Sequence, residues 1–352
     1  PAGWSATGSR STERACCTEP RRKRVMGLWN AAIHRRFQSV VSSCRDSAIS
    51  LRKLAMRFFA ICLWLLCLSQ SSAKEVTQFA SVDEQLAYLA GLPEEELVKF
   101  DIAYLNLVCA QGLKGSENLD IPACLRSLDE IAGFVKVNTE ANLHKYSQNP
   151  GEYANSEGQF RAICMVTVAV KGYGVRYDPD FIEAPDNLSP DEVFYGDSRN
   201  VFIHGLLQRE PRMGTCSSLP VFWTALGRHL GYPLFMSNTV IHFFTRWEDA
   251  SGKFDFEGTQ NGCAICDDSH YKQFPVKVDD AKIEYLDYLQ SFSRKRELMH
   301  FLLTRAMCLR ANGRKAEATK AYETAVLCYP STFSKGALYT YRKFLLTEHE
   351  HK

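Results

Sequence analysis

A cysteine, a histidine and two acidic residues stand in an order that can support nucleophilic chemistry. Cys216 lies at the expected start of a helix, and His242 follows 26 residues later within an apolar strand. A thiolate is the reactive form of cysteine, and a neighbouring imidazole can hold or remove its proton. A third group, Asp255 or Glu257, would orient the imidazole. These residue types predict a thiolate nucleophile, and the N–H groups at the helix start could bind a developing oxyanion.

The elements that must position these groups can be read from the same stretch of sequence. After Cys216, apolar side chains recur at the spacing of one helix face, at Leu219, Trp223, Leu226 and Leu230. Gly231 is expected to end that helix. Three strands should follow, the last two joined by a hairpin at residues 249–252: Leu234–Ser237, Ile241–Trp247 and Lys253–Glu257.

The length of the hairpin turn decides which face of the strand carries the acid. Strand alternation puts Asp255 and Glu257 on one face. A four-residue turn places Glu257 opposite Phe244, on the face of His242, whereas a five-residue turn places it on the other face. The pattern leaves this register open. Three other histidines are alternative bases: His204, His229 and His270. Of these, His229 lies within the Cys216 helix and is poorly placed to approach its N-terminus.

The regions on either side of this stretch are predicted to be helical. Before it, helices are expected at Val82–Leu92, Pro93–Gln111, Ile121–Gln148 and Glu157–Val170. After it, residues 297–330 carry small and aromatic residues at tetratricopeptide spacing, namely Ala306, Gly313, Ala318, Tyr322, Ala325 and Pro330. One such repeat cannot bury its own face, so it should pack on the helix expected at Ser334–Leu346 or on the core.

The first 73 residues have the composition of a leader rather than of a folded domain. Arg57 precedes an apolar run at 58–68, and small residues follow at 71–73, which is the build of a secretory signal peptide. We expect Met56 to be the true start, residues 1–55 to be translated upstream sequence or a disordered leader, and the protein to be exported to the periplasm or outside the cell. The alternative for residues 1–55 is a basic, Ser-rich presequence that targets an organelle. The apolar run is too short to span a bilayer, so no stable membrane insertion is expected after cleavage.

Without the leader the chain is acidic. Residues 1–73 hold 12 of the 42 basic and 3 of the 40 acidic residues, which leaves a net charge of about −7 for residues 74–352. Such a charge argues against binding to nucleic acid. Cys263 and Cys266, with His270 nearby, lack the second ligand pair of a structural zinc site, so a local disulfide or two thiols is expected there. No cofactor and no metal ion are predicted.

Three blocks of sequence resemble the transglutaminase-like superfamily, and its bacterial branch in particular. They are GTCSSLP at 214–220, LGRHLG at 226–231 and HFFTRW at 242–247. The family's acid sits in an Asp-Pro-Thr-like segment after the histidine strand, and its counterpart here is Glu257-Gly258-Thr259. The resemblance thus selects Cys216, His242 and Glu257, with Asp255 in reserve. Two departures stand out: Glu replaces Asp, and Ile241 stands where relatives often carry glycine.

The resemblance implies an α+β fold, with a helical N-terminal region, a papain-like transglutaminase core containing a small antiparallel sheet, and a helical repeat-like C-terminus. The expected boundaries are 1–55 leader, 56–73 signal peptide, 74–195 helical region, 196–280 catalytic core and 281–352 tetratricopeptide-like helices. The implied function is that of a cysteine hydrolase or acyltransferase acting on peptide-like amides of a protein or peptide substrate through a thioester. The alternative is a catalytically inactive scaffold that holds a protein partner at the C-terminal helices.

Overall fold

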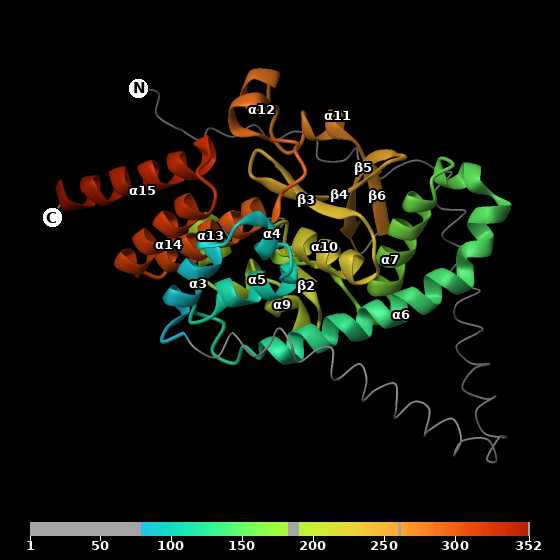
Figure 1. Ribbon diagram of the computed structural model, residues 1–352, viewed down its shortest axis with the longest axis horizontal. Helices are drawn as coiled ribbons and strands as arrows, with labels where there is room; N and C mark the ends of the chain where they lie inside the picture. Colours follow the sequence, from blue (N-terminus) through green and yellow to red (C-terminus); the bar gives the residue numbers. More distant parts are fainter. Residues whose placement is uncertain (1–78, 182–189, 260–261, 351–352) are drawn as a thin grey trace, which may run out of the picture. The chain divides into compact units, whose positions relative to one another are not determined.

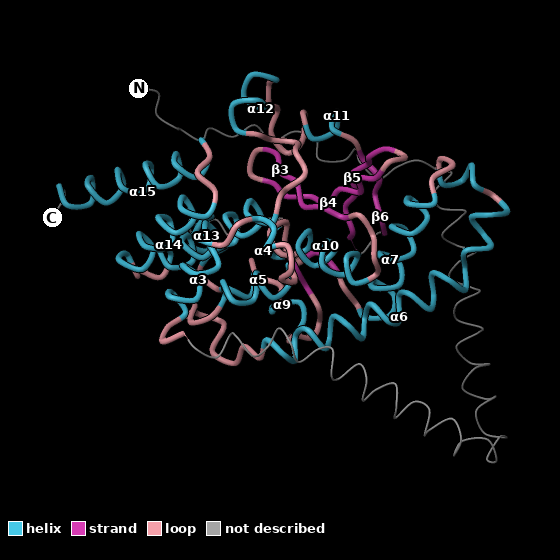
Figure 2. Tube along the Cα trace, viewed as in Figure 1, coloured by secondary structure: helices cyan, strands magenta, loops and turns pink. Residues whose placement is uncertain are grey.

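The computed structural model describes residues 79–181, 190–259 and 262–350 of the 352-residue chain. The expected leader (1–55) and signal peptide (56–73) lie outside the described residues. Residues from Phe79 onward form one compact unit of mixed helix and sheet, in which a small antiparallel sheet is surrounded by helices (Figures 1 and 2). The predicted α+β class is confirmed at this level.

The N-terminal helices match the sequence pattern with one exception. In chain order they are α3 (Val82–Gly91), α4 (Glu94–Leu97), α5 (Ile102–Ala110), α6 (Ile121–Gln148) and α7 (Glu157–Tyr173). The single helix expected over Pro93–Gln111 was wrong, because the chain breaks between α4 and α5. Asp101 causes the break, since its side chain accepts a hydrogen bond from Ala103 N–H at 2.8 Å and caps a new helix.

Short elements connect α7 to the sheet. They are β1 (Arg176–Tyr177), η3 (Pro179–Phe181), α8 (Pro190–Tyr195), η4 (Ser198–Asn200), α9 (His204–Leu207) and β2 (Met213–Gly214). A further short helix, η2 (Pro150–Tyr153), lies earlier, between α6 and α7. β1 and β2 pair in parallel and form a two-stranded sheet that the sequence did not predict. Helix α10 (Leu219–His229) follows β2 directly.

The main sheet has four antiparallel strands in chain order. They are β3 (Leu234–Thr239), β4 (His242–Asp249), β5 (Gly252–Thr259) and β6 (Gly262–Cys266). The three predicted strands are confirmed, and β6 is an addition. One face packs on α10 and α7, while the other is covered by the segment containing α11 (Asp268–Tyr271) and α12 (Asp280–Leu286) (Figure 1).

Three long helices complete the chain. They are α13 (Arg294–Ala311), α14 (Lys315–Cys328) and α15 (Thr332–Glu350). Of the small residues expected at tetratricopeptide spacing, Ala306, Ala318 and Ala325 are buried on this helix pair, whereas Gly313 is exposed in the turn between α13 and α14. Helix α15 packs on this pair, as Tyr341 stacks on Tyr322 with ring centroids 4.7 Å apart and donates its hydroxyl to Lys315 O at 3.1 Å.

Helix α13, near the C-terminal end of the chain, contacts the N-terminal helices α4 and α5. Glu94 of α4 accepts hydrogen bonds from the N–H groups of Arg294 (2.7 Å) and Lys295 (3.0 Å) at the start of α13. A carboxylate at this position satisfies helix-end donors and complements the helix dipole. Further along, the buried Arg305 guanidinium donates to Cys109 O at the end of α5, at 2.9 Å. The N-terminal and C-terminal helices therefore share one core.

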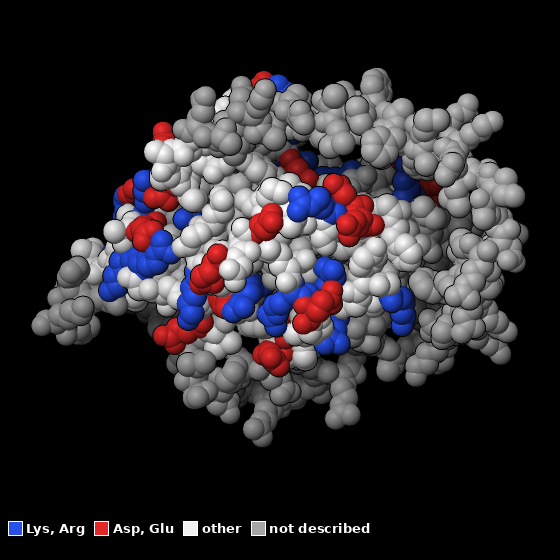
Figure 3. Space-filling view, turned by 90° about the horizontal axis from the view of Figure 1, so that it is seen from below, with Lys and Arg blue, Asp and Glu red and all other residues white. Residues whose placement is uncertain are grey.

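The described surface carries both signs of charge. On the face shown in Figure 3, basic and acidic side chains intermix and make no continuous patch of one sign. Among the described residues, none of the helices is both long enough and apolar enough to cross a membrane.

His229 at the end of α10 ties that helix to α5 and α6. Its Nε2 lies 2.6 Å from Asp101 Oδ2 and its Nδ1 lies 2.9 Å from Asp129 Oδ1. Burial lowers the pKa of this imidazole, but the hydrogen bonds and charges of the two carboxylates outweigh burial and raise it above 6.5. The imidazolium form is therefore the one that stabilises the fold.

We expect His229→Asn to lower the free energy of unfolding by about 1.5–3 kcal/mol near pH 5.5, the value of hydrogen bonds to charged groups. Because the folded pKa is raised, this stabilisation is complete below the unfolded value of 6.5 and is lost as pH rises through the folded pKa. Urea unfolding of both proteins from acidic to alkaline pH measures it. A difference that does not depend on pH would contradict a charged bridge.

Candidate active site

Cys216 lies in the turn between β2 and α10, three residues before the helix begins. The regular helix begins at Leu219 with Ser218 as its N-cap, and Leu219 N–H donates to Thr215 O at 2.9 Å, so the turn that holds Cys216 leads into the helix as the sequence predicted. The reason is local, because the side chains of Thr215 and Ser218 bind backbone N–H groups and hold the chain in a turn. The thiol is partly exposed and lies at the helix end that favours negative charge.

The turn uses most of its own backbone donors. Thr215 N–H donates to Ser218 Oγ at 3.0 Å, and Ser217 N–H donates to Thr215 Oγ1 at 3.2 Å. The N–H of Cys216 instead faces the hydroxyl of Tyr177. Among residues 215–217, the Cys216 N–H is thus the one left for the oxyanion role that the sequence assigned to the helix start.

His242 is the first residue of β4 and lies beside Glu257. It pairs with Thr239 of β3 across a two-residue loop. Its Nε2 is 2.6 Å from Glu257 Oε1, and its side chain is 10% exposed. The side chain also interacts with that of Cys216, for which the Nδ1 edge of the ring remains. The structure therefore brings Cys216, His242 and Glu257 together from the α10 turn, β4 and β5.

The surroundings of His242 favour its charged form. Burial lowers the pKa of the imidazole, but the hydrogen bonds and negative charges of Cys216 and Glu257 outweigh burial and raise it to about 10. At neutral pH the ring is an imidazolium with an acceptor on either side. A positive group beside a cysteine stabilises the thiolate, so the arrangement suits a cysteine nucleophile.

The hairpin register puts Glu257 on the required face. Asp249 pairs with Gly252 and Thr245 with Phe256, so the turn has the four residues 249–252. Glu257 is held from a second side by Tyr271 of α11, whose hydroxyl donates to Oε1 at 3.0 Å. Tyr271 is fully buried and stacks on Phe244 at 3.7 Å between ring centroids. Sequence reasoning missed Tyr271, because no local pattern links α11 to β5.

Asp255, the reserve acid, does not reach His242. It forms a buried ion pair with Arg246 directly opposite on β4, with Nε to Oδ1 at 2.6 Å and Nη2 to Oδ2 at 3.0 Å. Arg246 also binds Asp268 and donates to Leu289 O at 2.6 Å. Asp255 therefore serves the packing of the sheet on the α11–α12 segment, and Glu257 is the acid of the site.

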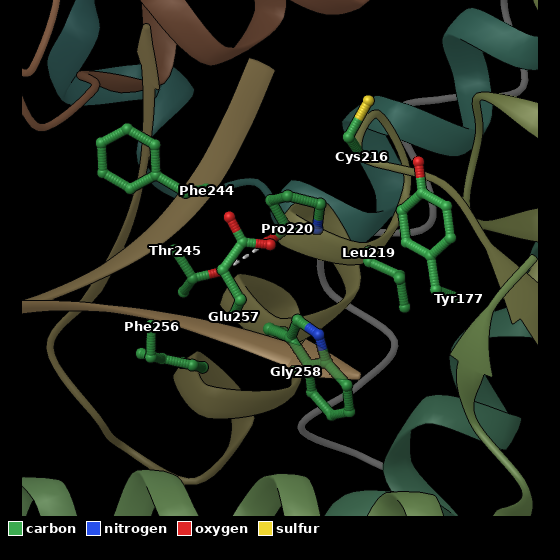
Figure 4. A pocket seen from close by; sticks show the side chains of 10 residues that line it. Tyr177, Cys216, Leu219, Pro220, Phe244, Thr245, Phe256, Glu257 and Gly258 are labelled. Carbon is green, nitrogen blue, oxygen red and sulfur yellow. Dashed lines mark hydrogen bonds between the residues drawn. The ribbon is translucent and has the colours of Figure 1, made fainter. Parts of the chain in front are cut away.

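A small pocket, partly open to solvent, adjoins Cys216 (Figure 4). Tyr177 and Glu257 line it with Cys216, while Trp223 and Gly258 contribute to its wall. The indole of Trp223 lies so close to Gly258 that a Cβ there would be 2.5 Å from Trp223 Cε2. Only glycine fits this contact, which fixes the distance between α10 and β5 beside the cysteine.

The other histidines have different surroundings. His204 is buried with Nε2 3.1 Å from Ser198 Oγ, and burial lowers its pKa to about 4. His229 binds Asp101 and Asp129, as described above. His270 stacks on Phe274 at 5.2 Å. Phe274 in turn lies edge-on to His242 at 5.4 Å, so His270 is near the site but in an outer layer.

Cys263 and Cys266 occupy β6 at the edge of the sheet. Cys263 lies opposite Gly258 and Cys266 opposite Asp255, so the two thiols point to opposite faces. Their Cα atoms are about 10 Å apart in an extended strand, beyond the reach of a disulfide. This distance excludes the local disulfide, which was one of the two arrangements expected for these cysteines. No group of three or more potential metal ligands gathers among the described residues.

The chain matches no protein-family model, no curated protein and no solved structure. Its similarity to the transglutaminase-like superfamily stays a hypothesis drawn from the residues around the cysteine and histidine.

The two acids of β5 should respond differently to neutralisation. Glu257→Gln removes a hydrogen bond and a charge that raise the pKa of His242. The pKa of His242 should therefore fall well below its raised value of about 10, with little loss of stability. Asp255→Asn should cost about 3–5 kcal/mol of stability, because Arg246 stays buried with part of its charge unpaired. NMR titration of His242 and thermal unfolding measure the two effects, and an exchange of the two phenotypes would refute the assignment.

Ile241, in the loop before His242, has an unfavourable backbone conformation. Its φ is 53°, a left-handed value that suits glycine and costs a β-branched residue about 1–2 kcal/mol. Glycine would adopt this backbone conformation without strain. The Ile241 side chain is 79% exposed, so it offers little packing in return.

Ile241→Gly should therefore raise the free energy of unfolding by up to about 1 kcal/mol, after allowing for the greater chain entropy of glycine. The matched control is Val240→Gly in the same loop, where φ is not positive and the side chain packs against a buried cluster. That variant should be less stable than wild type. Destabilisation by both changes would show that the Ile241 conformation carries no strain.

Proposed function

We propose that this protein is a cysteine-nucleophile enzyme of the transglutaminase-like kind, which hydrolyses or transfers acyl groups of peptide-like amides. The observation that supports it best is the 2.6 Å contact between His242 Nε2 and Glu257 Oε1 beside Cys216. A nucleophile, a base and a group that orients the base meet from separate elements, in the arrangement that covalent catalysis needs. The proposal includes export, which rests on the sequence of residues 56–73 alone.

The reaction would proceed in two halves. The Cys216 thiolate attacks the substrate carbonyl carbon, a C–S bond forms, and the carbonyl electron pair moves onto oxygen. When that pair returns, the C–N bond breaks and the His242 imidazolium gives its proton to the leaving amine. Water or a second amine then attacks the thioester while His242 removes its proton, and the C–S bond breaks to release the acyl product and restore the Cys216 thiolate. Water completes hydrolysis and an amine completes acyl transfer.

Glu257 and Tyr271 would keep His242 in position through this cycle. Glu257 accepts from Nε2 and stabilises the imidazolium, and the buried Tyr271 hydroxyl holds the same carboxylate oxygen. The longer side chain of Glu, compared with the Asp expected in relatives, reaches the imidazole at normal hydrogen-bond distance. The first departure from the family pattern is therefore compatible with an active site.

Alkylation of Cys216 tests the nucleophile. In a Cys263→Ser, Cys266→Ser background, iodoacetamide should modify Cys216 at near-neutral pH at least about tenfold faster than in the same protein with His242→Ala, because the imidazolium stabilises the thiolate. Since the His242 pKa is raised to about 10, the faster alkylation of the protein that retains His242 should be seen at neutral pH. The difference in rate should fade as pH rises through that value. Peptide mass spectrometry measures the rate at each thiol.

An activated ester tests the chemistry. p-Nitrophenyl acetate should acetylate Cys216 and then release acetate, and Cys216→Ala should abolish both steps. Alkylation that is indifferent to His242, together with no acetylation, would remove the enzyme proposal. The alternative, an inactive scaffold that binds a protein partner through the C-terminal helices, would then be favoured.

A further inference from the structure

Tyr177 is fixed beside Cys216 by backbone pairing rather than by proximity in sequence. It lies on β1 opposite Gly214 of β2, two residues before the cysteine. Hydrogen bonds on either side hold this register, from Arg176 N–H to Arg212 O at 3.0 Å and from Asp178 N–H to Gly214 O at 2.8 Å. The position of the Tyr177 ring therefore follows from the same short ladder that leads into the Cys216 turn.

The phenol points at the nucleophile. Figure 4 shows the Tyr177 hydroxyl directed toward the Cys216 sulfur at the mouth of the pocket. The two side chains line the same pocket, and Cys216 influences the pKa of the phenol through its charge and through its backbone and side chain. Burial, followed by the nearby charge of Cys216, raises the pKa of the phenol. The hydroxyl thus keeps its proton and is a hydrogen-bond donor at neutral pH.

A tetrahedral oxyanion at this site needs more than one donor. Enzymes that form such intermediates aim preorganised N–H or O–H groups at the oxygen, usually as a pair. In the Cys216 turn, the N–H groups of Thr215 and Ser217 are taken by neighbouring side chains. The Cys216 N–H supplies one donor, and the Tyr177 hydroxyl, which lines the same pocket, can supply a second.

The positions of the two donors are compatible. Because the Tyr177 hydroxyl and Cys216 line one pocket (Figure 4), an oxygen atom that enters it next to the sulfur can approach both donors. A carbonyl oxygen of a substrate attacked by Cys216 would enter at that point. There it would accept one hydrogen bond from each donor.

We propose that the Tyr177 hydroxyl and the Cys216 N–H together form the oxyanion-binding pair of this site. The proposal rests on the function proposed above. As the C–S bond forms, the carbonyl electron pair moves to oxygen and receives hydrogen bonds from both groups. When the pair returns, the bond to the leaving group breaks. Tyr177 keeps its proton throughout, and His242 supplies the proton of the leaving amine.

Two reagents distinguish an oxyanion-binding role of the Tyr177 hydroxyl from one in which the phenol only shields the Cys216 thiol. Iodoacetamide reacts by displacement at a saturated carbon and forms no oxyanion, whereas p-nitrophenyl acetate forms one. Tyr177→Phe keeps the ring and removes only the hydroxyl. It should lower the rate of Cys216 acetylation about 100-fold, the usual loss for one oxyanion donor, and change the alkylation rate by less than about threefold. Tyr339→Phe, an exposed phenol on α15, is the matched control and should change neither rate.

The other outcomes overturn the proposal in distinguishable ways. A rise of both rates in Tyr177→Phe would mean that the phenol only shields the thiolate. A parallel fall of both rates would mean that it only supports the structure, as would loss of the His242-dependence of alkylation. Unchanged acetylation would mean that another group binds the oxyanion. If the wild-type protein alkylates in a His242-dependent way but is never acetylated, the function itself fails, and Tyr177 has no oxyanion to bind.

Discussion

The candidate site depends on the register of one hairpin. A shift of β5 by a single residue along β4 would turn Glu257 to the opposite face and leave His242 without its acid. The buried Arg246–Asp255 pair holds the register, because the two residues face each other only when Asp249 pairs with Gly252. An ion pair of this kind adds little net stability, yet breaking it is costly. Its value here is that it excludes the neighbouring alignments.

Much of the fold could be predicted because its signals are local. The helix expected at residues 121–148 has the observed bounds, since Asp120 caps its first turn and apolar residues recur along one face. The order of cysteine, histidine and acid along the chain, with the hairpin between the last two, predicted which side chains meet. Side-chain chemistry narrowed the acid to Asp255 or Glu257 and the family resemblance favoured Glu257, but the register that places Glu257 beside His242 became visible only in the pairing of the strands.

The features that the sequence did not predict depend mostly on contacts between segments that are distant along the chain. The pairing of β1 with β2 involves two residues from each strand, too few for any periodic pattern, so Tyr177 carried no signal of its place beside Cys216. Tyr271 reaches Glu257 because α11 folds back over the sheet. The break before α5 is a local event that was missed, because the capping preference of Asp101 outweighs a continuous apolar run.

The hydrogen bonds from α13 to Glu94 have a consequence for biosynthesis. Glu94 and Arg294 are separated by 200 residues, and ribosomes add about 5–20 residues per second. The helices α3–α5 therefore emerge roughly 10–40 seconds before the helix that covers them. During that interval the faces of these helices that α13 covers have no lasting partner on the nascent chain. Because α10 packs against α5, the cysteine turn acquires its final support only when translation is nearly complete.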